Sequence, residues 1–237
     1  TRVSRLASTL RLDATLQVRH RVYLIVLGAT LGLALAIRSV VTPEQLEFFM
    51  PVLVMYGVSL TTVFLVGVLL LLERSEGTLS VVMVSPLRPS EYLASKLITL
   101  AGLALVESTI VAVVAYGLGW SFGWFVLAVV MRASMGVGVG VAVGVRYSSI
   151  TRFLFPGILA SLAFDFPNFW YFEIWPTSLF YLWPSMPPLL LAKSAFFAVE
   201  PLQLVYAFVY GPLVVGAALF WASRSIDRFV VRGEFTS

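Results

Sequence analysis

The sequence predicts an all-α polytopic membrane protein with six transmembrane helices, and three observations support this fold class. Of the 237 residues, 59% are hydrophobic and only 12% are charged, whereas a soluble domain carries about 25% charged residues. The mean hydropathy is +0.95. The apolar runs reach the length of about 18 residues that a membrane-spanning helix requires, while strands of a membrane barrel would alternate over about ten residues.

Charged residues lie mainly between the apolar runs. The net charge of +4 would suggest nucleic acid in a soluble protein, but here the basic residues flank the spans and suit lipid headgroups. We therefore expect membrane lipids, and no nucleic acid, as partners. The chain has no Cys, which excludes thiolate metal sites, and no Ser-His-Asp arrangement or paired carboxylates inside a span. It is not expected to be an enzyme or to hold a metal or cofactor.

The first two spans follow a basic N-terminal segment. Residues 1–21 carry five arginines among leucine and valine residues, which predicts an amphipathic helix in the membrane interface. The first span is expected at 22–41, and we expect it to be retained, because no small-residue cleavage site is found there. Pro43 suits the start of a new helix, and the second span is expected at 47–72.

A polar segment at 73–96 interrupts the apolar chain before the third span. It has a charged start, a Gly-Thr pair, an apolar stretch, a Ser-Pro break and a second helical start that ends in Lys96. This pattern favours a folded element that touches another molecule over a simple loop. The third span is expected at 97–118 and the fourth at 124–145, with a tight turn from Gly119 to Gly123 between them.

The fifth span is expected at 153–165, and its regular pattern fails near Asp165. The following segment, 166–200, contains five prolines and three tryptophans, so it cannot form one continuous helix. Short re-entrant helices in the outer leaflet fit this composition, because Trp favours the interface; an ordinary surface loop is the alternative. The sixth span is expected at 202–223 and a polar tail at 224–237.

The basic residues assign the orientation of these spans. Six spans place both termini on one side, and that side also carries Arg74, Arg88, Lys96, Arg146 and Arg152. The other side holds acidic residues and a single lysine: Glu44, Glu47, Asp165, Glu173, Glu200 and Lys193. By the positive-inside rule, we expect a multi-pass protein of the cytoplasmic (inner) membrane with both termini in the cytoplasm.

Two charges lie inside predicted spans, Glu107 in the third and Arg132 in the fourth. These antiparallel neighbours place the two groups at depths that differ by roughly 6 Å, which an arginine can bridge. Ionisable groups inside a membrane are costly unless they are paired or lie in a wet cavity. We expect a structural Glu107–Arg132 ion pair, and a direct role in substrate or proton handling is the alternative.

Glycines in the fourth span indicate helix packing. Gly136, Gly140 and Gly144 share one stripe, and small residues at such spacing allow close helix approach. The Gly-rich run lies inside an apolar span and lacks the Gly-Lys-Ser/Thr ending of a phosphate-binding loop. Energy from a nucleotide would therefore have to come from another chain.

The polar segment resembles the signature of ABC-2-type transporter permeases. The residues that match that signature in order are Glu73, Arg74, Glu76, Gly77, Thr78, Leu79, Ser85, Pro86, Leu87, Glu91 and Lys96. The stretch RLDATLQVRHRVY, with Asp13, Gln17, Arg19 and Tyr23, is similar to a narrower group, the fluoroquinolone-export-type permeases. The shared plan covers residues 1–237 as a single transmembrane domain.

The resemblance implies the permease subunit of an ATP-driven exporter. Two permease chains, identical or related, would form the membrane unit, and two separate ATPase subunits would bind Mg-ATP. The segment 73–96 would be the coupling helix against the ATPase. The residues expected in this coupling are Glu73, Arg74, Glu76, Gly77, Thr78, Leu79, Val82, Met83, Pro86, Leu87, Glu91 and Lys96.

Aromatic residues are the candidates for the transport path. The resemblance implies that 166–200 is an outer gate, closed by Phe166, Trp170, Trp175 and Trp183. A pathway lined by Phe49, Met55, Tyr56 and Phe155 would suit a drug or lipid-like amphipathic compound. The alternative is that these side chains face lipid or the protein core. A proton-coupled secondary transporter and a non-transporting membrane scaffold also remain open as functions.

Overall fold

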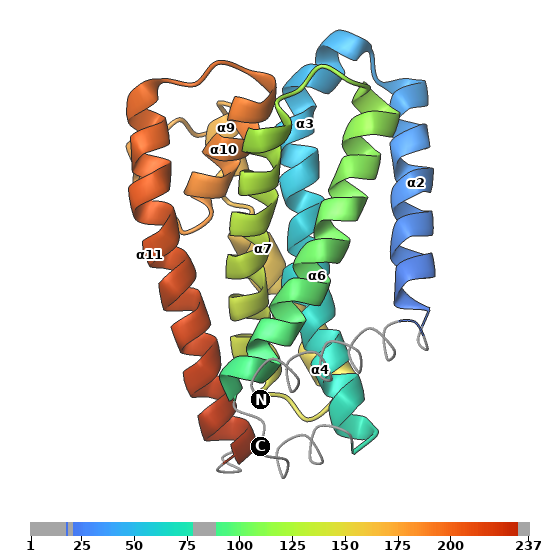
Figure 1. The fold of residues 1–237 in the computed structure, drawn as a ribbon, viewed down its shortest axis with the longest axis vertical. Helices are drawn as coiled ribbons and strands as arrows, with labels where there is room; N and C mark the ends of the chain where they lie inside the picture. Colours follow the sequence, from blue (N-terminus) through green and yellow to red (C-terminus); the bar gives the residue numbers. More distant parts are fainter. Residues whose placement is uncertain (1–17, 19–20, 78–88, 232–237) are drawn as a thin grey trace.

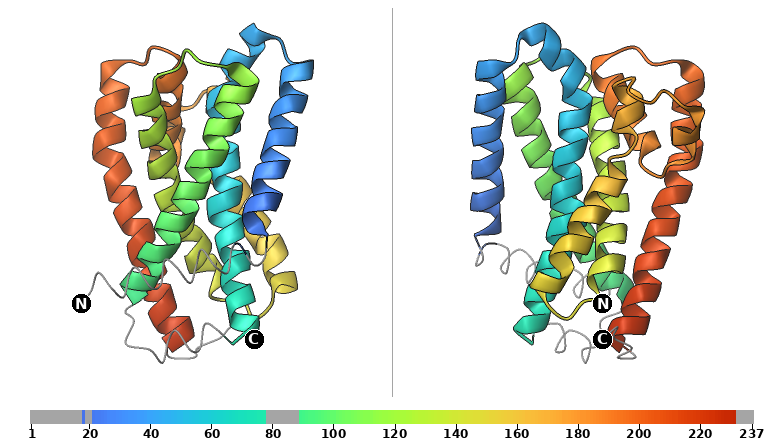
Figure 2. Two further views of the ribbon diagram at one scale, coloured as in Figure 1. Left: turned by 45° about the vertical axis from the view of Figure 1, so that its right-hand side comes forward. Right: turned by 180° about the vertical axis from the view of Figure 1, so that it is seen from behind.

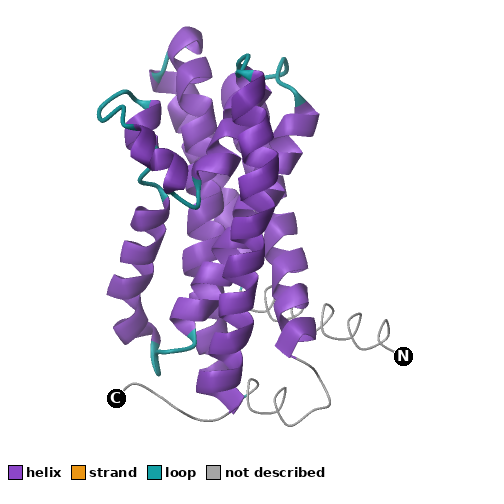
Figure 3. Ribbon diagram, turned by 90° about the vertical axis from the view of Figure 1, so that its left-hand side faces the viewer, coloured by secondary structure: helices purple, strands orange, loops and turns teal. Residues whose placement is uncertain are grey.

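The computed structural model describes residue 18, residues 21–77 and residues 89–231, and within these ranges the chain is helical without strands (Figure 3). Within the described ranges, six helical stretches are long and apolar enough to cross a membrane, which confirms the predicted fold class. They are Tyr23–Val40, Glu44–Ser75, Ser90–Tyr116, Phe122–Gly144, Ile150–Tyr171 and Pro201–Phe229. The interfacial helix predicted at 1–21 lies almost wholly outside the described residues.

Most spans consist of one main helix, and several carry a short π-helical turn. The first three spans are built from α2 (Val22–Val40), α3 (Pro43–Ser59), η1 (Leu60–Phe64), α4 (Leu65–Ser75), α6 (Pro89–Val111) and η2 (Ala112–Tyr116). The remaining elements are α7 (Phe122–Gly144), α8 (Ile150–Phe164), α9 (Asn168–Tyr171), η3 (Ser178–Leu182), α10 (Met186–Phe196), α11 (Pro201–Ile226) and η4 (Asp227–Val231).

Helices extend beyond several predicted boundaries. Residues 89–96, where a second helical start was predicted within the polar segment, are the first turns of α6, which starts with Pro89 and has Glu91 in its first turn. Proline and an acidic residue both favour a helix N-terminus. The sixth span likewise continues through Ile226 and η4 into the predicted tail. Among the polar residues of these extensions, Ser95 and Lys96 are buried by neighbouring helices, whereas Asp227 and Arg228 are exposed.

The two ends of the bundle differ in their side chains. The start of α2, the end of α4 and the ends of α7 and α11 lie together (Figures 1 and 2). We call this the basic end, because its described cations include Arg21, Arg74, Arg146, Arg152, Arg224 and Arg228. The α2–α3 and α6–α7 connections lie at the opposite end, with α9 and α10.

Helix α7 is the centre of the bundle. It packs against α3, η1, α4, α6, α8, α10 and α11. A Cβ atom at Gly140 would lie 2.3 Å from the Val63 carbonyl oxygen, and one at Gly138 would lie 2.8 Å from the Ala218 carbonyl carbon. The predicted glycine stripe is therefore a packing face: Gly136, Gly140 and Gly144 all meet η1 or α4.

We expect Gly140→Ala to lower the free energy of unfolding by about 1–3 kcal/mol, because the added methyl group overlaps the backbone of η1. Gly123→Ala, in the first turn of the same helix, is the matched control. A Cβ at Gly123 meets nothing within 4 Å, and alanine is the better helix former. Unfolding in detergent measures both; equal stability of the two variants would contradict the tight α7–η1 contact.

The fifth span is interrupted inside the bundle. Helix α8 stops at Phe164, and short elements follow up to α10, whose helix starts with prolines at its first positions. Two bonds satisfy carbonyls at the end of α8: the Trp183 indole N–H donates to Ala163 O at 2.9 Å, and the Ser185 hydroxyl donates to Phe164 O. Such pairing is required where a helix ends away from water. The broken segment is thereby held against the rest of the protein.

Candidate functional site

A buried ion pair joins the first and the last residue of the signature, which lie on α4 and α6. Glu73, near the end of α4, is 6% exposed, and Lys96 on α6 is 1% exposed. The Lys96 ammonium bonds the Glu73 carboxylate, which also accepts a hydrogen bond of 2.7 Å from the Tyr92 hydroxyl. A buried charge is tolerated when it is paired and hydrogen-bonded in this way. These three side chains therefore tie α4 to α6 at the basic end.

This burial changes the role of two predicted coupling residues. Glu73 was expected among the residues that contact the ATPase, but its carboxylate points into the α4–α6 contact. Lys96 is likewise enclosed by the protein. Their common partner Tyr92 lies one turn before Lys96 on α6, and sequence reasoning missed it. The pair anchors the signature segment and does not offer a contact surface.

Other signature residues lie close to this anchor. Arg74 donates a hydrogen bond of 2.8 Å to the Tyr147 carbonyl in the α7–α8 connection. Glu76 is exposed, and Gly77 has a φ of 73° at the end of α4. Glu91 is half-buried in the first turn of α6. The remaining expected coupling residues lie outside the described residues: Thr78, Leu79, Val82, Met83, Pro86 and Leu87.

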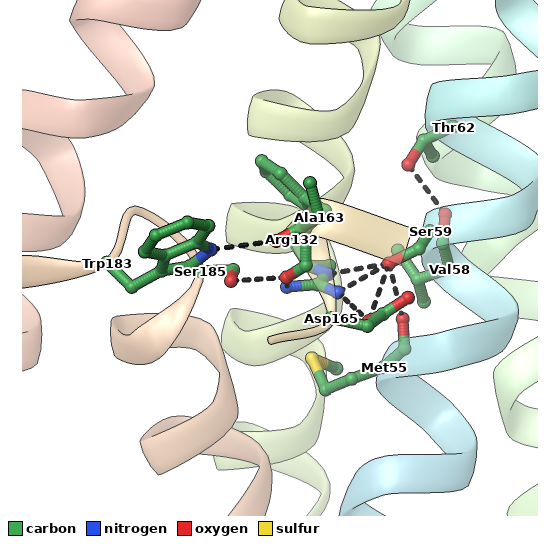
Figure 4. Close-up of polar contacts among 10 residues, drawn as sticks. Met55, Val58, Ser59, Thr62, Arg132, Ala163, Asp165, Trp183 and Ser185 are labelled. Atoms are coloured by element: carbon green, nitrogen blue, oxygen red, sulfur yellow. Dashed lines mark hydrogen bonds and ion pairs between the residues drawn. The ribbon is translucent and has the colours of Figure 1, made fainter. Parts of the chain in front are cut away.

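Arg132 has a different partner from the one that the sequence predicted. Its guanidinium bonds the Asp165 carboxylate just after α8, and its Nε–H donates to Ser59 Oγ at 3.0 Å (Figure 4). It also donates to the Phe164 carbonyl at 3.2 Å and lies over the Phe164 ring. Arg132 and Asp165 are both buried. This Arg132 cluster joins α3 and α7 to the point where α8 ends.

Glu107 lies in separate surroundings. It projects from α6 toward η1, where the Thr61 hydroxyl lies 2.7 Å from each carboxylate oxygen. The expected Glu107–Arg132 pair does not form, because the two side chains leave their helices toward different neighbours: Arg132 reaches Ser59 and Asp165, and Glu107 reaches Thr61. Antiparallel neighbours need not turn their charged positions toward each other.

Glu107 borders a cleft of about 400 Å³ that has mainly apolar walls. Residues of α2, α3, η1, α4 and α6 form the walls, and Tyr56 is one of these residues. Of the other expected pathway residues, Met55 is buried in the core, Phe49 packs on Phe172 at 5.6 Å between ring centroids, and Phe155 is 69% exposed on α8. The four therefore do not line one common path within this chain.

The expected gate residues belong to an aromatic layer around α9 and η3. Phe166 and Trp183 are in edge contact, with ring centroids 5.4 Å apart. Trp170 packs on Tyr181 at 5.7 Å, and the exposed Trp175 packs on Phe180 at 5.9 Å. The structure thus brings Phe166 and Trp183 together but gives Trp170 and Trp175 other partners. These contacts hold the segment that links α8 to α10.

Several polar residues of these sites were missed by sequence reasoning. Asp165 was expected on the outer surface, yet it is buried beside Arg132; its place directly after an apolar run was an available signal. Ser59 and Thr61 look like ordinary small residues of an apolar span, and so does Ser108 on α6. Their contacts depend on how each helix is rotated about its own axis, and a single sequence does not show that rotation.

Comparisons with known proteins extend over nearly the whole chain. A family model described as the fluoroquinolones export permease protein family matches residues 4–234. The Fluoroquinolones export permease protein of Mycobacterium tuberculosis (strain CDC 1551 / Oshkosh) is 30% identical over 241 residues, which cover 97% of this chain and 98% of the relative. The protein of that name from strain ATCC 25618 / H37Rv matches equally. With its six potential spans, the chain belongs to the fluoroquinolones export permease protein family.

Proposed function

We propose that this chain is the permease subunit of an ATP-driven exporter that moves a hydrophobic or amphipathic compound out across the cytoplasmic membrane. The family to which the chain belongs is described as export permeases. The observation that carries the ATP-driven part is the Glu73–Lys96–Tyr92 anchor, which joins α4 and α6 on both sides of the signature segment. A push on that segment would reach both helices together.

The proposed transmission starts at the basic end, which the positive-inside rule assigns to the cytoplasm. Two ATPase subunits, which would bind Mg-ATP, act on the segment between α4 and α6. The anchor makes the two helices move as a unit, and the Arg74 bond to Tyr147 extends the connection to the start of α8. Rigid helices that shift against packed neighbours are a common form of such coupling.

A second copy of the permease, or a related chain, would complete the membrane unit. One chain offers no single path through the expected pathway residues Phe49, Met55, Tyr56 and Phe155. Phe155 and its neighbours on α8 expose apolar side chains, namely Leu154, Ile158, Leu159 and Leu162. In the proposed complex such a face would meet lipid or the other permease chain.

Transport by purified components tests this function. The chain is reconstituted in liposomes with a candidate ATPase subunit that co-purifies with it, and uptake of a fluoroquinolone is measured with ATP and Mg²⁺ on the ATPase side. We expect uptake that needs both the ATPase and hydrolysable ATP. Uptake driven by a pH gradient without the ATPase would instead establish proton-coupled transport, for which the buried Glu107 is the candidate group. Absence of uptake under both conditions would favour a scaffold.

A further inference from the structure

The cleft beside Glu107 has the size and the lining of a small-molecule site. Its volume of about 400 Å³ falls in the range of about 300–1,000 Å³ that is typical of ligand pockets. Helix α2 supplies one wall and packs against α6 and η2. Leu33 and Ile37 of α2 line the cleft, and so do Phe64 and Leu65 from the second span. An apolar molecular body would therefore be covered from both sides.

Two polar groups in this lining have unused bonding capacity. Glu107 is 4% exposed, and both of its printed contacts come from the single hydroxyl of Thr61. One hydroxyl donates one proton, while a carboxylate offers about four acceptor sites. No cation of the described residues lies within 4.0 Å of Glu107. The carboxylate is thus buried in an apolar wall without a counter-ion from the described chain.

Ser108 provides an independent sign of a ligand. Ser108 lines the same cleft and is 2% exposed, and its hydroxyl has no hydrogen-bond partner among the described residues. Unsatisfied buried hydroxyl groups are uncommon and destabilising in folded proteins. The Thr30 side chain of α2 adds a further polar group to the cleft. Residues with polar side chains on α2, η1 and α6 therefore line a cleft whose walls are otherwise mainly apolar.

We propose that this cleft binds an amphipathic organic cation, with its positive centre beside Glu107 and its apolar body between α2 and η1. The carboxylate would supply the charge that a cation requires, and the apolar walls would remove the body of the molecule from water. A lipid chain would fill the apolar part but would leave the carboxylate unpaired. The proposal rests on the proposed export function and names organic cations as its substrate class.

Binding to the chain alone separates this proposal from the question of ATP coupling. The full chain in lipid nanodiscs, without ATPase or nucleotide, is dialysed against tetraphenylphosphonium or against tetraphenylborate, which has nearly the same shape and the opposite charge. Binding to empty nanodiscs is subtracted. We expect saturable binding of the cation and none of the anion. Equal binding of both ions, or no binding of the cation, would overturn the proposal.

Two variants place the site at the cleft, each with a matched control. Glu107→Gln removes the charge, and Glu44→Gln removes an exposed charge at the start of α3. Gly57→Leu fills the cleft, because a Cβ there meets only Glu107 Oε1, at 4.0 Å. Gly28→Leu adds the same side chain on α2, where a Cβ meets nothing within 4 Å. We expect tenfold weaker cation binding, or worse, in the two cleft variants and no change in the controls.

The outcomes distinguish the cation site from the export function. Size-exclusion chromatography and thermal unfolding establish that each variant is folded, and the comparison of the two ions in the unchanged chain decides the charge preference even if one variant fails. If both cleft variants are folded and still bind the cation, the site lies elsewhere and the proposal is wrong. Binding that depends on Glu107 without ATP-driven uptake would uphold the site and refute the proposed energy source.

Discussion

Replacing Arg132 by methionine is expected to lower the free energy of unfolding by about 3–5 kcal/mol, which is the effect of leaving one partner of a buried ion pair alone. The substitution removes the bonds to Asp165, Ser59 and the Phe164 carbonyl together. The Asp165 carboxylate would then remain buried without its counter-ion. Unfolding in detergent with increasing dodecyl sulfate measures the loss, and Arg152→Met, an exposed arginine in the first turn of α8, is the matched control.

Removing both charges provides the decisive comparison. We expect Arg132→Met combined with Asp165→Leu to be more stable than Arg132→Met alone, because apolar side chains of similar volume often replace a buried pair without loss. Glu107→Gln should add its effect independently, since Glu107 and Arg132 share no partner among the described contacts. A coupling energy above about 1 kcal/mol between Glu107 and Arg132 would restore the pair that the sequence suggested.

In the proposed complex of permease and ATPase, replacing Gly77 by proline is expected to reduce substrate-stimulated ATP turnover at least about tenfold, or roughly 1.4 kcal/mol. Gly77 has a φ of 73°, whereas proline requires a φ near −65°. Its N–H also donates to the Arg74 carbonyl at 3.1 Å, and proline has no such donor. The chain would therefore leave α4 in another direction and misplace the segment that we propose contacts the ATPase.

Asparagine at the same position is the control for Gly77→Pro. Among residues other than glycine, asparagine adopts left-handed backbone comparatively readily, and it keeps the N–H. Gly77→Asn should therefore retain most of the turnover, and both variants should keep the stability of the membrane bundle. ATP turnover is measured on the complex in lipid with and without substrate. Full coupling in Gly77→Pro would mean that the direction of the chain after α4 does not matter for the ATPase contact.

The proportion of apolar residues and their run lengths were enough to predict the class of the fold. Each span is an apolar helix long enough to cross the bilayer, whether it faces protein or lipid. The pattern can therefore be recognised in the sequence without knowing the neighbouring helices. The ends of helices could be predicted less exactly at polar stretches. Helix α6 starts at Pro89, whereas the third span was expected at 97–118. There Tyr92 and Lys96 are buried against α4, which supplies Glu73 as their partner. The sequence of α6 by itself does not show that α4 packs on these residues.

The candidate sites were likewise predictable only in part from the sequence. The sequence alone determined that Glu107 and Arg132 lie within spans and that a signature segment follows the second span. Only the tertiary structure decided that Arg132 meets Asp165, and that Glu107 borders an apolar cleft with Thr61. The physical reason is rotational: a sequence sets the depth of a residue along its helix, but the packing of all helices sets the direction in which that residue points.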